Sequence, residues 1–233
     1  MKYLKIMLFS LMLGGCNGGG DSLLLDVNID LPIPNPLPAL VETPTIQIKE
    51  ANVSGAGCPS GSGSVTVSDD SRTLSVLFDE YEAIAGVGSG VDGGSDVTTS
   101  RVACNIAISL HIPTGYQAFL IGADFRGAVT LPVDGIAEFN REYFFASARS
   151  KMLTTTWSGE LDDETIDISD DLYADSNSHH RCGEDVILRS NTSLYITAPA
   201  DADTALIQMD SLDYENQQYK TQFDYQFSYV KCS

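Results

Sequence analysis

The sequence predicts an all-β protein, an antiparallel, jelly-roll-like β-sandwich braced by two disulfides. Apolar and polar residues alternate in many short segments, which is the pattern of strands that bury one face. Gly, Asp and Ser cluster between those segments, as they do in the turns of sandwich proteins. Beyond the N-terminal region, no stretch keeps a 3.6-residue apolar period with helix caps over three turns.

Residues 1–15 are predicted to be a signal peptide. Lys2 and Lys5 make its start positive, and the apolar run Ile6–Leu13 is too short to span a membrane. The run ends in Leu-Gly-Gly-Cys, which resembles the bacterial lipobox, where a peptidase cuts before a lipidated cysteine. We therefore expect Cys16 to become the lipid-carrying N-terminus, with an ordinary secretory signal cut elsewhere as the alternative.

A lipid on Cys16 would attach the protein to a membrane. Asn17 follows that cysteine, whereas Asp at this position favours retention in the inner membrane of Gram-negative bacteria. The several acyl chains of a bacterial lipoprotein anchor stably, at about 0.8 kcal/mol per buried methylene. The expected location is therefore the bacterial outer membrane, with the protein facing the periplasm or the cell surface.

Residues 16–50 are predicted to form a tether, and residues 51–233 the β-sandwich domain. Gly18–Gly20 is flexible, and five of the nine prolines fall between positions 32 and 44. Closely spaced prolines keep the backbone extended and remove hydrogen-bond donors, which excludes a helix or a central strand.

The domain is expected to contain strands separated by surface loops. The alternation is clearest in segments 64–68, 74–78, 106–112, 119–125, 186–196 and 219–229. In the fourth segment, the odd-numbered residues Phe119, Ile121, Ala123 and Phe125 are expected to face the core. Aromatic residues from Tyr219 to Tyr229 line one face of the last segment and indicate core packing. The polar insertions Gly86–Ser100 and Asp162–Cys182 are predicted to be surface loops.

The chain is strongly acidic. It carries 13 Lys and Arg against 32 Asp and Glu, a formal net charge of −19. Loss of Lys2 and Lys5 with the signal leaves 11 basic residues against 32 acids, a balance of −21. A surface of this sign repels phosphate backbones, so nucleic acid is excluded as a partner.

The five cysteines divide into Cys16 and four in the domain, Cys58, Cys104, Cys182 and Cys232. An even number in an exported domain indicates two disulfides, and the C-x-x-C spacing of zinc sites is absent. Three connectivities are open. If the strand after Cys182 runs antiparallel beside the strand before Cys232, these two cysteines meet. That arrangement favours Cys58–Cys104 and Cys182–Cys232.

Several short elements, in their order and spacing, resemble a known family. They are Gly57-Cys58-Pro59, Ser64–Ser68, Leu77–Asp79, Arg101–Cys104, Pro113–Tyr116, Asp124–Gly127, Cys182-Gly183 and Cys232. The set resembles the secreted proteins catalogued as domain of unknown function 4360, over about residues 52–233. The resemblance implies an exported, disulfide-bonded β domain and supplies no catalytic residue. The lipobox and the proline-rich tether depart from the plain secretory signal expected there, which alters the predicted location and not the fold.

Catalytic motifs are weak in this sequence. The G-x-S-x-G elbow of Ser-His-Asp hydrolases is absent. His111 is expected on the exposed face of a strand, and the adjacent His179 and His180 would point opposite ways, which favours a solvated loop over a metal site. Calcium is kept as a candidate cofactor because acids crowd the predicted loops, although no EF-hand spacing occurs. These acids are Asp92, Asp96, Asp162, Asp163, Asp170, Asp171, Asp201 and Asp203.

Five residues form the predicted ligand-binding set. Tyr116, Trp157 and Tyr195 are expected on the polar sides of strands, as platforms for stacking sugars. Asp124 and Arg126 share one strand face and are expected to form a structural ion pair or part of a binding surface. The predicted function is a non-catalytic module that binds a glycan or an envelope protein. The alternative is a carboxylate-based hydrolase of an extracellular polymer, with or without calcium.

Overall fold

Strands make up the regular structure of this protein. Its computed structural model describes residues 44–61, 63–78, 81–90, 96–145, 151–172, 181–209, 211–213 and 218–232. The predicted signal peptide, Cys16 and most of the predicted tether lie outside these residues. So do Asp92, His179 and His180.

Thirteen strands follow one another within the described residues. They are β1 (Gln47–Ser54), β2 (Ser64–Val67), β3 (Thr73–Phe78), β4 (Glu82–Ala85), β5 (Thr99–His111), β6 (Tyr116–Leu131), β7 (Ile136–Phe145), β8 (Leu153–Ser158), β9 (Leu161–Asp171), β10 (Val186–Thr197), β11 (Ala205–Gln208), β12 (Ser211–Asp213) and β13 (Gln218–Lys231). Nowhere in the described ranges is there a helix that is both long and apolar enough to cross a membrane.

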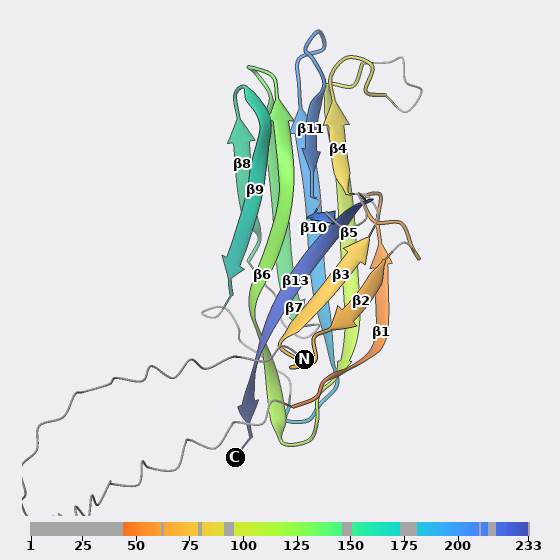
Figure 1. Cartoon of the computed structure of the whole chain (residues 1–233), viewed down its shortest axis with the longest axis vertical. Helices are drawn as coiled ribbons and strands as arrows, with labels where there is room; N and C mark the ends of the chain where they lie inside the picture. The colour runs from red at the N-terminus through yellow and green to blue at the C-terminus, as the bar shows by residue number, and fades with distance from the viewer. Residues whose placement is uncertain are drawn as a thin grey trace, which may run out of the picture. The chain divides into compact units, whose positions relative to one another are not determined.

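The strands form two antiparallel sheets packed against each other (Figure 1). The five-stranded sheet has the order β1-β5-β10-β7-β8. The eight-stranded sheet has the order β2-β3-β13-β6-β11-β4, with β12 paired to β13 and β9 paired to β6. The predicted all-β antiparallel sandwich is confirmed.

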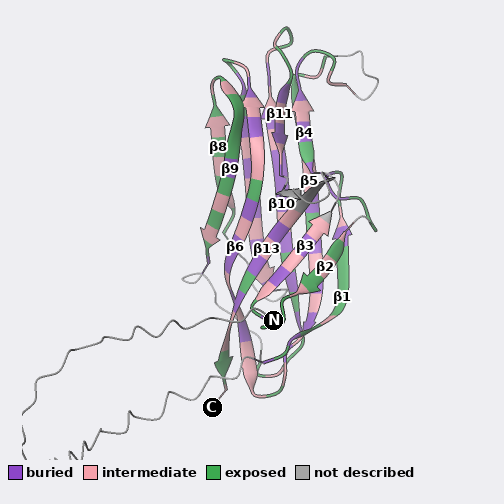
Figure 2. Ribbon diagram, viewed as in Figure 1, coloured by how far each residue is buried: buried purple, intermediate pink, exposed green. Residues whose placement is uncertain are grey.

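The core between the sheets is apolar and rich in aromatic rings, as the buried positions in Figure 2 indicate. Phe125 of β6 meets Phe139 of β7 and Phe223 of β13 edge to face, with ring centroids 5.1 and 4.6 Å apart. Such pairs contribute roughly 0.5–1.5 kcal/mol beyond the area they bury. The predicted aromatic core face of the last strand is confirmed at Phe223, Tyr225 and Phe227.

A β-bulge in β6 reverses which of its residues face the core. The register with β13 skips one residue of β6, at Ile121. Beyond the bulge, Ala123 and Phe125 are buried, as predicted. Before it, Phe119 and Ile121 are only half-buried and Leu120 is buried instead. The prediction for Phe119 and Ile121 is wrong, because a single inserted residue flips the face without changing the apolar pattern.

The segment predicted as a loop from Asp162 to Cys182 begins with a strand, so that prediction is wrong for residues 162–171. They belong to β9, which pairs with β6. Most of the acids that suggested a loop point to solvent from this edge strand, whereas Ile166 is buried. Charged side chains protect an exposed edge from pairing with other chains. Gly159, at φ 86°, makes the short turn that carries the chain from β8 in one sheet to β9 in the other.

Both predicted disulfides are present, Cys58–Cys104 and Cys182–Cys232. The reasoning that favoured the second pair is wrong, because β10 and β13 belong to different sheets and are not neighbours. The two cysteines meet instead at the turn between β5 and β6. There the Gly183 amide donates to the Tyr116 carbonyl, and the Cys232 amide donates to the Gly115 carbonyl, both at 2.8 Å.

The two disulfides differ in accessibility, and we expect reductants to discriminate between them. Cys58 and Cys104 are fully buried, whereas Cys182 is exposed and Cys232 is half-buried. Because a reductant must reach a sulfur atom to attack it, a water-soluble phosphine, which is oxidised to its oxide in the reaction, should open Cys182–Cys232 first under native conditions. The double variant Cys182→Ser/Cys232→Ser removes a link of sequence separation 50 and should lose at most about 4 kcal/mol of unfolding free energy. Differential alkylation read by mass spectrometry measures the order; equal labelling of all four cysteines would contradict it.

Candidate functional site

The outer face of the five-stranded sheet is largely polar, with the exposed apolar residues Ile136 and Ile187 toward its ends. β10 is its central strand, flanked by β5 and β7. Side chains alternate along β10, so Leu194 and Ile196 enter the core while Tyr195 points outward. Residues opposite each other in an antiparallel pair share a face, so the register partners of Tyr195 also point outward. The name β10 face is used for the outward side chains of β10 together with their outward neighbours on β5, β7 and β8.

Tyr195 is the aromatic centre of one end of the β10 face. It lies opposite Arg101 on β5 and Glu138 on β7, and Glu138 lies opposite Thr156 on β8. Arg101 is exposed and Tyr195 half-buried. The Arg101 guanidinium donates to the Ser193 hydroxyl at 3.5 Å, the long limit of a hydrogen bond. This row offers an aromatic ring with a donor on one side and a carboxylate acceptor on the other.

Amides, hydroxyls, one carboxylate and Ala103 occupy the two rows next to Tyr195. One row holds Ser193, Asn140 and Thr154, and the other holds Asn105, Asn191 and Glu142. The Asn191 amide donates to Glu142 at 3.4 Å, a weak hydrogen bond, and Thr154 donates to Asn140 at an ordinary 2.7 Å. Apart from Ser193, which is only 6% exposed, the polar residues of these rows present both donors and acceptors to solvent.

A second aromatic side chain stands at the other end of the β10 face. Phe144 on β7 lies opposite Arg189 on β10, and Phe144 is half-buried while Arg189 is exposed. Arg189 and Tyr195 are separated along β10 by about 20 Å, at roughly 3.4 Å per residue. Each end of the face thus combines an aromatic ring with an arginine.

The other two predicted stacking platforms, Tyr116 and Trp157, pack against the hydrophobic core instead of standing on a polar face. Trp157 on β8 lies opposite Ala137, whose side chain is fully buried. Tyr116 begins β6, with the Lys231 ammonium 5.9 Å from its ring centroid. Of the three aromatic residues predicted to bind sugars, Tyr195 is the one on the β10 face.

Asp124 and Arg126 lie on the outer face of the other sheet. Asp124 accepts hydrogen bonds from Ser169 at 2.6 Å and from Gln226 at 2.5 Å. It makes no salt bridge with Arg126 among those found in the described residues. A second carboxylate, Asp224 of β13, lies directly opposite Asp124 in the register. The structure therefore separates this pair from Tyr195 and brings Asp124 beside another acid.

A buried ion pair between the two sheets was missed by the sequence analysis. Arg141 of β7 and Asp170 of β9 have side chains only 4% and 8% exposed. The Arg141 Nε and Nη2 donate to the two carboxylate oxygens at 2.7 and 3.0 Å. The Tyr143 hydroxyl donates to the same carboxylate at 2.6 Å. This bidentate geometry is the strong form of an Arg–carboxylate contact.

Tyr143 remains a neutral donor in this cluster. Its pKa lies well above the ordinary value, because burial disfavours the phenolate and the nearby Asp170 carboxylate repels it further. A sequence signal for the cluster existed. Arg141 and Tyr143 share the parity of Phe139 in a period-two segment, and Asp170 shares the parity of Ile166.

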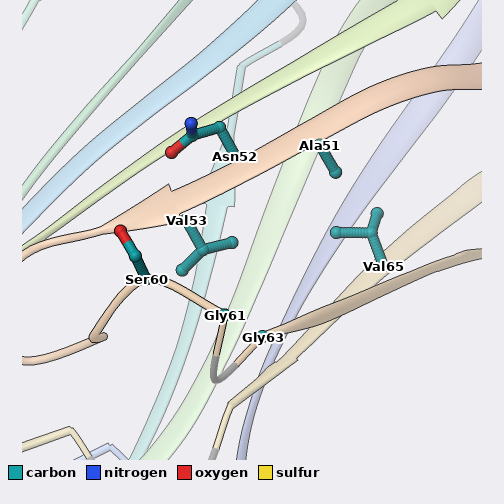
Figure 3. Close-up of a pocket in the computed structure, with 7 residues that line it drawn as sticks. All are labelled: Ala51, Asn52, Val53, Ser60, Gly61, Gly63 and Val65. Carbon is teal, nitrogen blue, oxygen red and sulfur yellow. The ribbon is translucent and has the colours of Figure 1, made fainter.

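A small pocket opens between β1 and β2, which are edge strands of different sheets (Figure 3). Its volume is about 180 Å³. The lining residues are Ala51, Asn52, Val53, Ser60, Gly61, Gly63 and Val65. Figure 3 shows the methyl groups of Ala51, Val53 and Val65 directed toward the space between the strands. None of the lining side chains is an acid, a base or a thiol, so the pocket offers little for chemistry.

The acids predicted as calcium ligands are dispersed. No group of three or more His, Cys, Asp and Glu side chains that could hold a metal ion occurs in the described ranges. Asp170 is occupied by Arg141, and Asp96 accepts the Gly88 amide at 3.0 Å. Those ranges therefore bring no three of the predicted acids together, and Asp92 lies outside them.

His111 belongs to an exposed ionic trio at the end of β5. Its Nδ1 is 2.7 Å from an Asp185 oxygen, and the Lys49 ammonium is 2.5 Å from the other. These contacts, Lys49 first, lower the pKa of Asp185. All three side chains are substantially exposed, so the trio is a solvated surface contact worth little to stability.

Comparisons with known proteins bear on the family. The family described as "Domain of unknown function (DUF4360)" matches residues 44–232. A protein of Arthroderma benhamiae described as an "Uncharacterized secreted protein" is 28% identical over 170 residues, which cover 72% of this chain and 66% of the relative. The chain thus spans just under two thirds of that relative's length.

A solved structure of TmCBM61 in complex with beta-1,4-galactotriose aligns with 79% of this chain and 90% of that chain, at 9% identity and a TM-score of 0.25. An alignment this loose carries no argument about the fold or the ligand of this chain. The sandwich assignment stands on the chain's own sheets and disulfides.

Removing one partner of the buried ion pair should destabilise the domain strongly. Asp170→Asn keeps the shape of the side chain but leaves the Arg141 guanidinium buried without a counter-ion, so we expect a loss of about 3–5 kcal/mol. Asp167→Asn is the matched control, because Asp167 is exposed on the same strand and should change the unfolding free energy by less than about 0.5 kcal/mol. Urea unfolding measures both variants, and equal midpoints would show that the pair carries no such role.

Proposed function

The chain belongs to the DUF4360 family, and from that premise we propose that it is an exported, lipid-anchored and non-catalytic binding module that holds its ligand on the β10 face. Two disulfides and a relative described as secreted support an extracellular setting. The ligand would be a glycan or a protein of the cell envelope or its surroundings.

The placement of Tyr195 carries this proposal. An aromatic ring on an open sheet face, between a guanidinium and a carboxylate, can stack on a ligand and orient it through hydrogen bonds. Neighbouring amides and hydroxyls extend the same chemistry along β10. Because the side chains stand on central strands, they are positioned by hydrogen-bonded neighbours on both sides, which limits the ordering cost of binding.

Anchoring through Cys16 supplies the location in this proposal. The signal 1–15 would be removed, the residues from Cys16 to the start of β1 would form the tether, and the domain would stand away from the outer membrane. The predicted boundary at residue 50 moves back because residues 47–50 already belong to β1, which pairs with β5. An extended tether of some 30 residues reaches up to roughly 90 Å, at about 3.1 Å per residue.

A carboxylate-based hydrolase is the second candidate function, favoured by one observation. Asp124 and Asp224 lie directly opposite each other on the outer face of the eight-stranded sheet. Like charges directly opposite each other destabilise a sheet, and two facing carboxylates are a candidate for acid–base work. The hydrogen bonds of both carboxylates argue against a hydrolase. Asp124 accepts hydrogen bonds from Ser169 and Gln226, and Asp224 accepts one from Ser75 at 2.5 Å.

Substitution of Tyr195 should weaken ligand binding without unfolding the domain. We expect the full chain to bind at least one member of a glycan array or isolated envelope fraction, and Tyr195→Ala to weaken that binding roughly 10-fold, about 1.4 kcal/mol. Thr66→Ala, an exposed change on β2, is the control and should bind as the wild type does. Release of reducing ends from the bound polymer, abolished by Asp224→Asn, would instead support the hydrolase.

Lipidation should depend on a single residue. Cells fed labelled palmitate are expected to label the wild-type protein and not Cys16→Ser, because acylation of a lipobox requires the thiol of that cysteine. The variant should also leave the membrane fraction, since a loss of the acyl chains removes the stable anchor. Label retained on Cys16→Ser would contradict the proposed anchor.

A further inference from the structure

We infer that the β10 face binds an extended, uncharged polysaccharide that lies along β10 from Tyr195 to Phe144. This inference rests on the proposed binding function and names the class of ligand and its direction on the sheet. Three observations carry it: the charge balance of the face, the spacing of its two aromatic rings, and the loose engagement of the polar groups that β10 contributes.

The β10 face is electrically balanced in a chain that is strongly acidic. Arg101 and Arg189 are matched by Glu138 and Glu142, whereas the chain as a whole has a net charge of −19. A polyanion would meet the two glutamates and a repelling field around them, and a polycation would meet the two arginines. An uncharged polymer meets neither penalty, and its hydroxyl groups can donate to the carboxylates and accept from the guanidinium groups.

The spacing of the aromatic rings favours a long, narrow ligand over a protein surface. Protein interfaces concentrate their binding energy in a contiguous apolar centre that is depleted of charge. Here Tyr195 and Arg189, the register partner of Phe144, are about 20 Å apart along β10, at roughly 3.4 Å per residue. The rows between them hold Asn191, Ser193 and their polar register partners. A chain of sugar rings can place apolar ring faces on the aromatic side chains at the two ends of the β10 face. Its hydroxyl groups can then hydrogen-bond the polar rows in the middle.

The polar groups that β10 itself contributes are held more loosely than those of the opposite outer face, whereas Thr154 on the same face donates to Asn140 at 2.7 Å. Arg101 donates to Ser193 at 3.5 Å and Asn191 to Glu142 at 3.4 Å. On the eight-stranded sheet, by contrast, the side chains around Asp124 and Asp224 hydrogen-bond one another at 2.5–3.0 Å. Donors already in strong hydrogen bonds lose them when a ligand binds, whereas long contacts are exchanged for ligand contacts at small cost. Of the two outer sheet faces, the β10 face therefore loses less hydrogen-bond energy when a ligand binds.

The test is a length series of sugars offered to the full lipidated chain in a detergent without sugar headgroups. The uncharged probes are gluco-, manno-, xylo- and galacto-oligosaccharides, and the anionic probes are oligogalacturonate and oligoalginate. Calorimetry should show binding to at least one uncharged series, with an affinity that rises with length and then levels off once the oligomer spans the face. Affinity should be unchanged between about 0.05 M and about 0.5 M sodium chloride, because no charge is screened.

Two variants locate the ligand. With oligomers long enough to span the face, Tyr195→Ala and Phe144→Ala should each reduce affinity at least 10-fold. With the shortest binding oligomers, one of these two variants should bind as the wild type does, since a short chain touches one aromatic ring. Val230→Ala, which trims an exposed apolar residue of β13, is the matched control and should leave every affinity unchanged.

Several outcomes would overturn the inference. Binding restricted to the anionic probes and weakened by salt would reject an uncharged ligand while leaving the proposed binding function intact. Binding that ignores oligomer length, or that survives both aromatic substitutions, would reject the track along β10. Binding of a purified envelope protein through Tyr195, without binding of any sugar, would likewise reject the polysaccharide and retain the module. Cleavage of a bound oligomer would reject the non-catalytic function itself.

Discussion

The ion pair of Arg141 and Asp170 is the interaction on which the packing of the two sheets depends. A buried pair recovers its desolvation cost only when the geometry is good and the remaining donors are satisfied. The guanidinium finds the Phe139 carbonyl at 3.0 Å and the Thr155 hydroxyl at 3.1 Å, and the carboxylate accepts the Tyr143 hydroxyl. A slip of β9 by one residue would turn Asp170 to solvent and leave the Arg141 guanidinium buried without a counter-ion. The pair therefore favours the observed register, because a one-residue slip leaves a lone buried charge.

Strand β7 links the buried ion pair to the β10 face, because it contributes side chains to both. Its inward side chains include Arg141 and Tyr143, and its outward side chains Glu142 and Phe144 alternate with them. Because side chains alternate along a strand, holding Arg141 in place also sets the direction of its two outward neighbours. Glu142 and Phe144 then stand opposite the residues of β10 that complete the β10 face. Setting the direction of these outward side chains from the core beneath them lowers the ordering cost of binding.

Period-two alternation made the fold class predictable, and features that depend on a partner strand were not. The aromatic face at Phe223 and the number of disulfides follow from local pattern and cysteine count. The bulge at Ile121 is a property of two paired strands, so a single apolar pattern cannot reveal it. Asp170 was assigned to a loop because acids surround it, although its inward position resembles that of a core residue. Tyr195 could be placed on a polar face from sequence, but its neighbours on β5 and β7 required the register.

The proposed tether, the acidic charge of the protein and the open β10 face together determine how strongly a polymer is bound, because tethering raises the effective concentration of binding sites. An open sheet face with two separated aromatic rings has no deep pocket, so each contact along it contributes modestly to affinity. If the lipid on Cys16 holds the domain near its polymer, as proposed, many weakly bound modules on one surface engage one long chain together. The acidic remainder of the protein repels anionic polymers. Specificity therefore comes from this repulsion as well as from the contacts with the bound polymer. A balanced face on an acidic body therefore favours an uncharged polymer without needing high affinity at any single site.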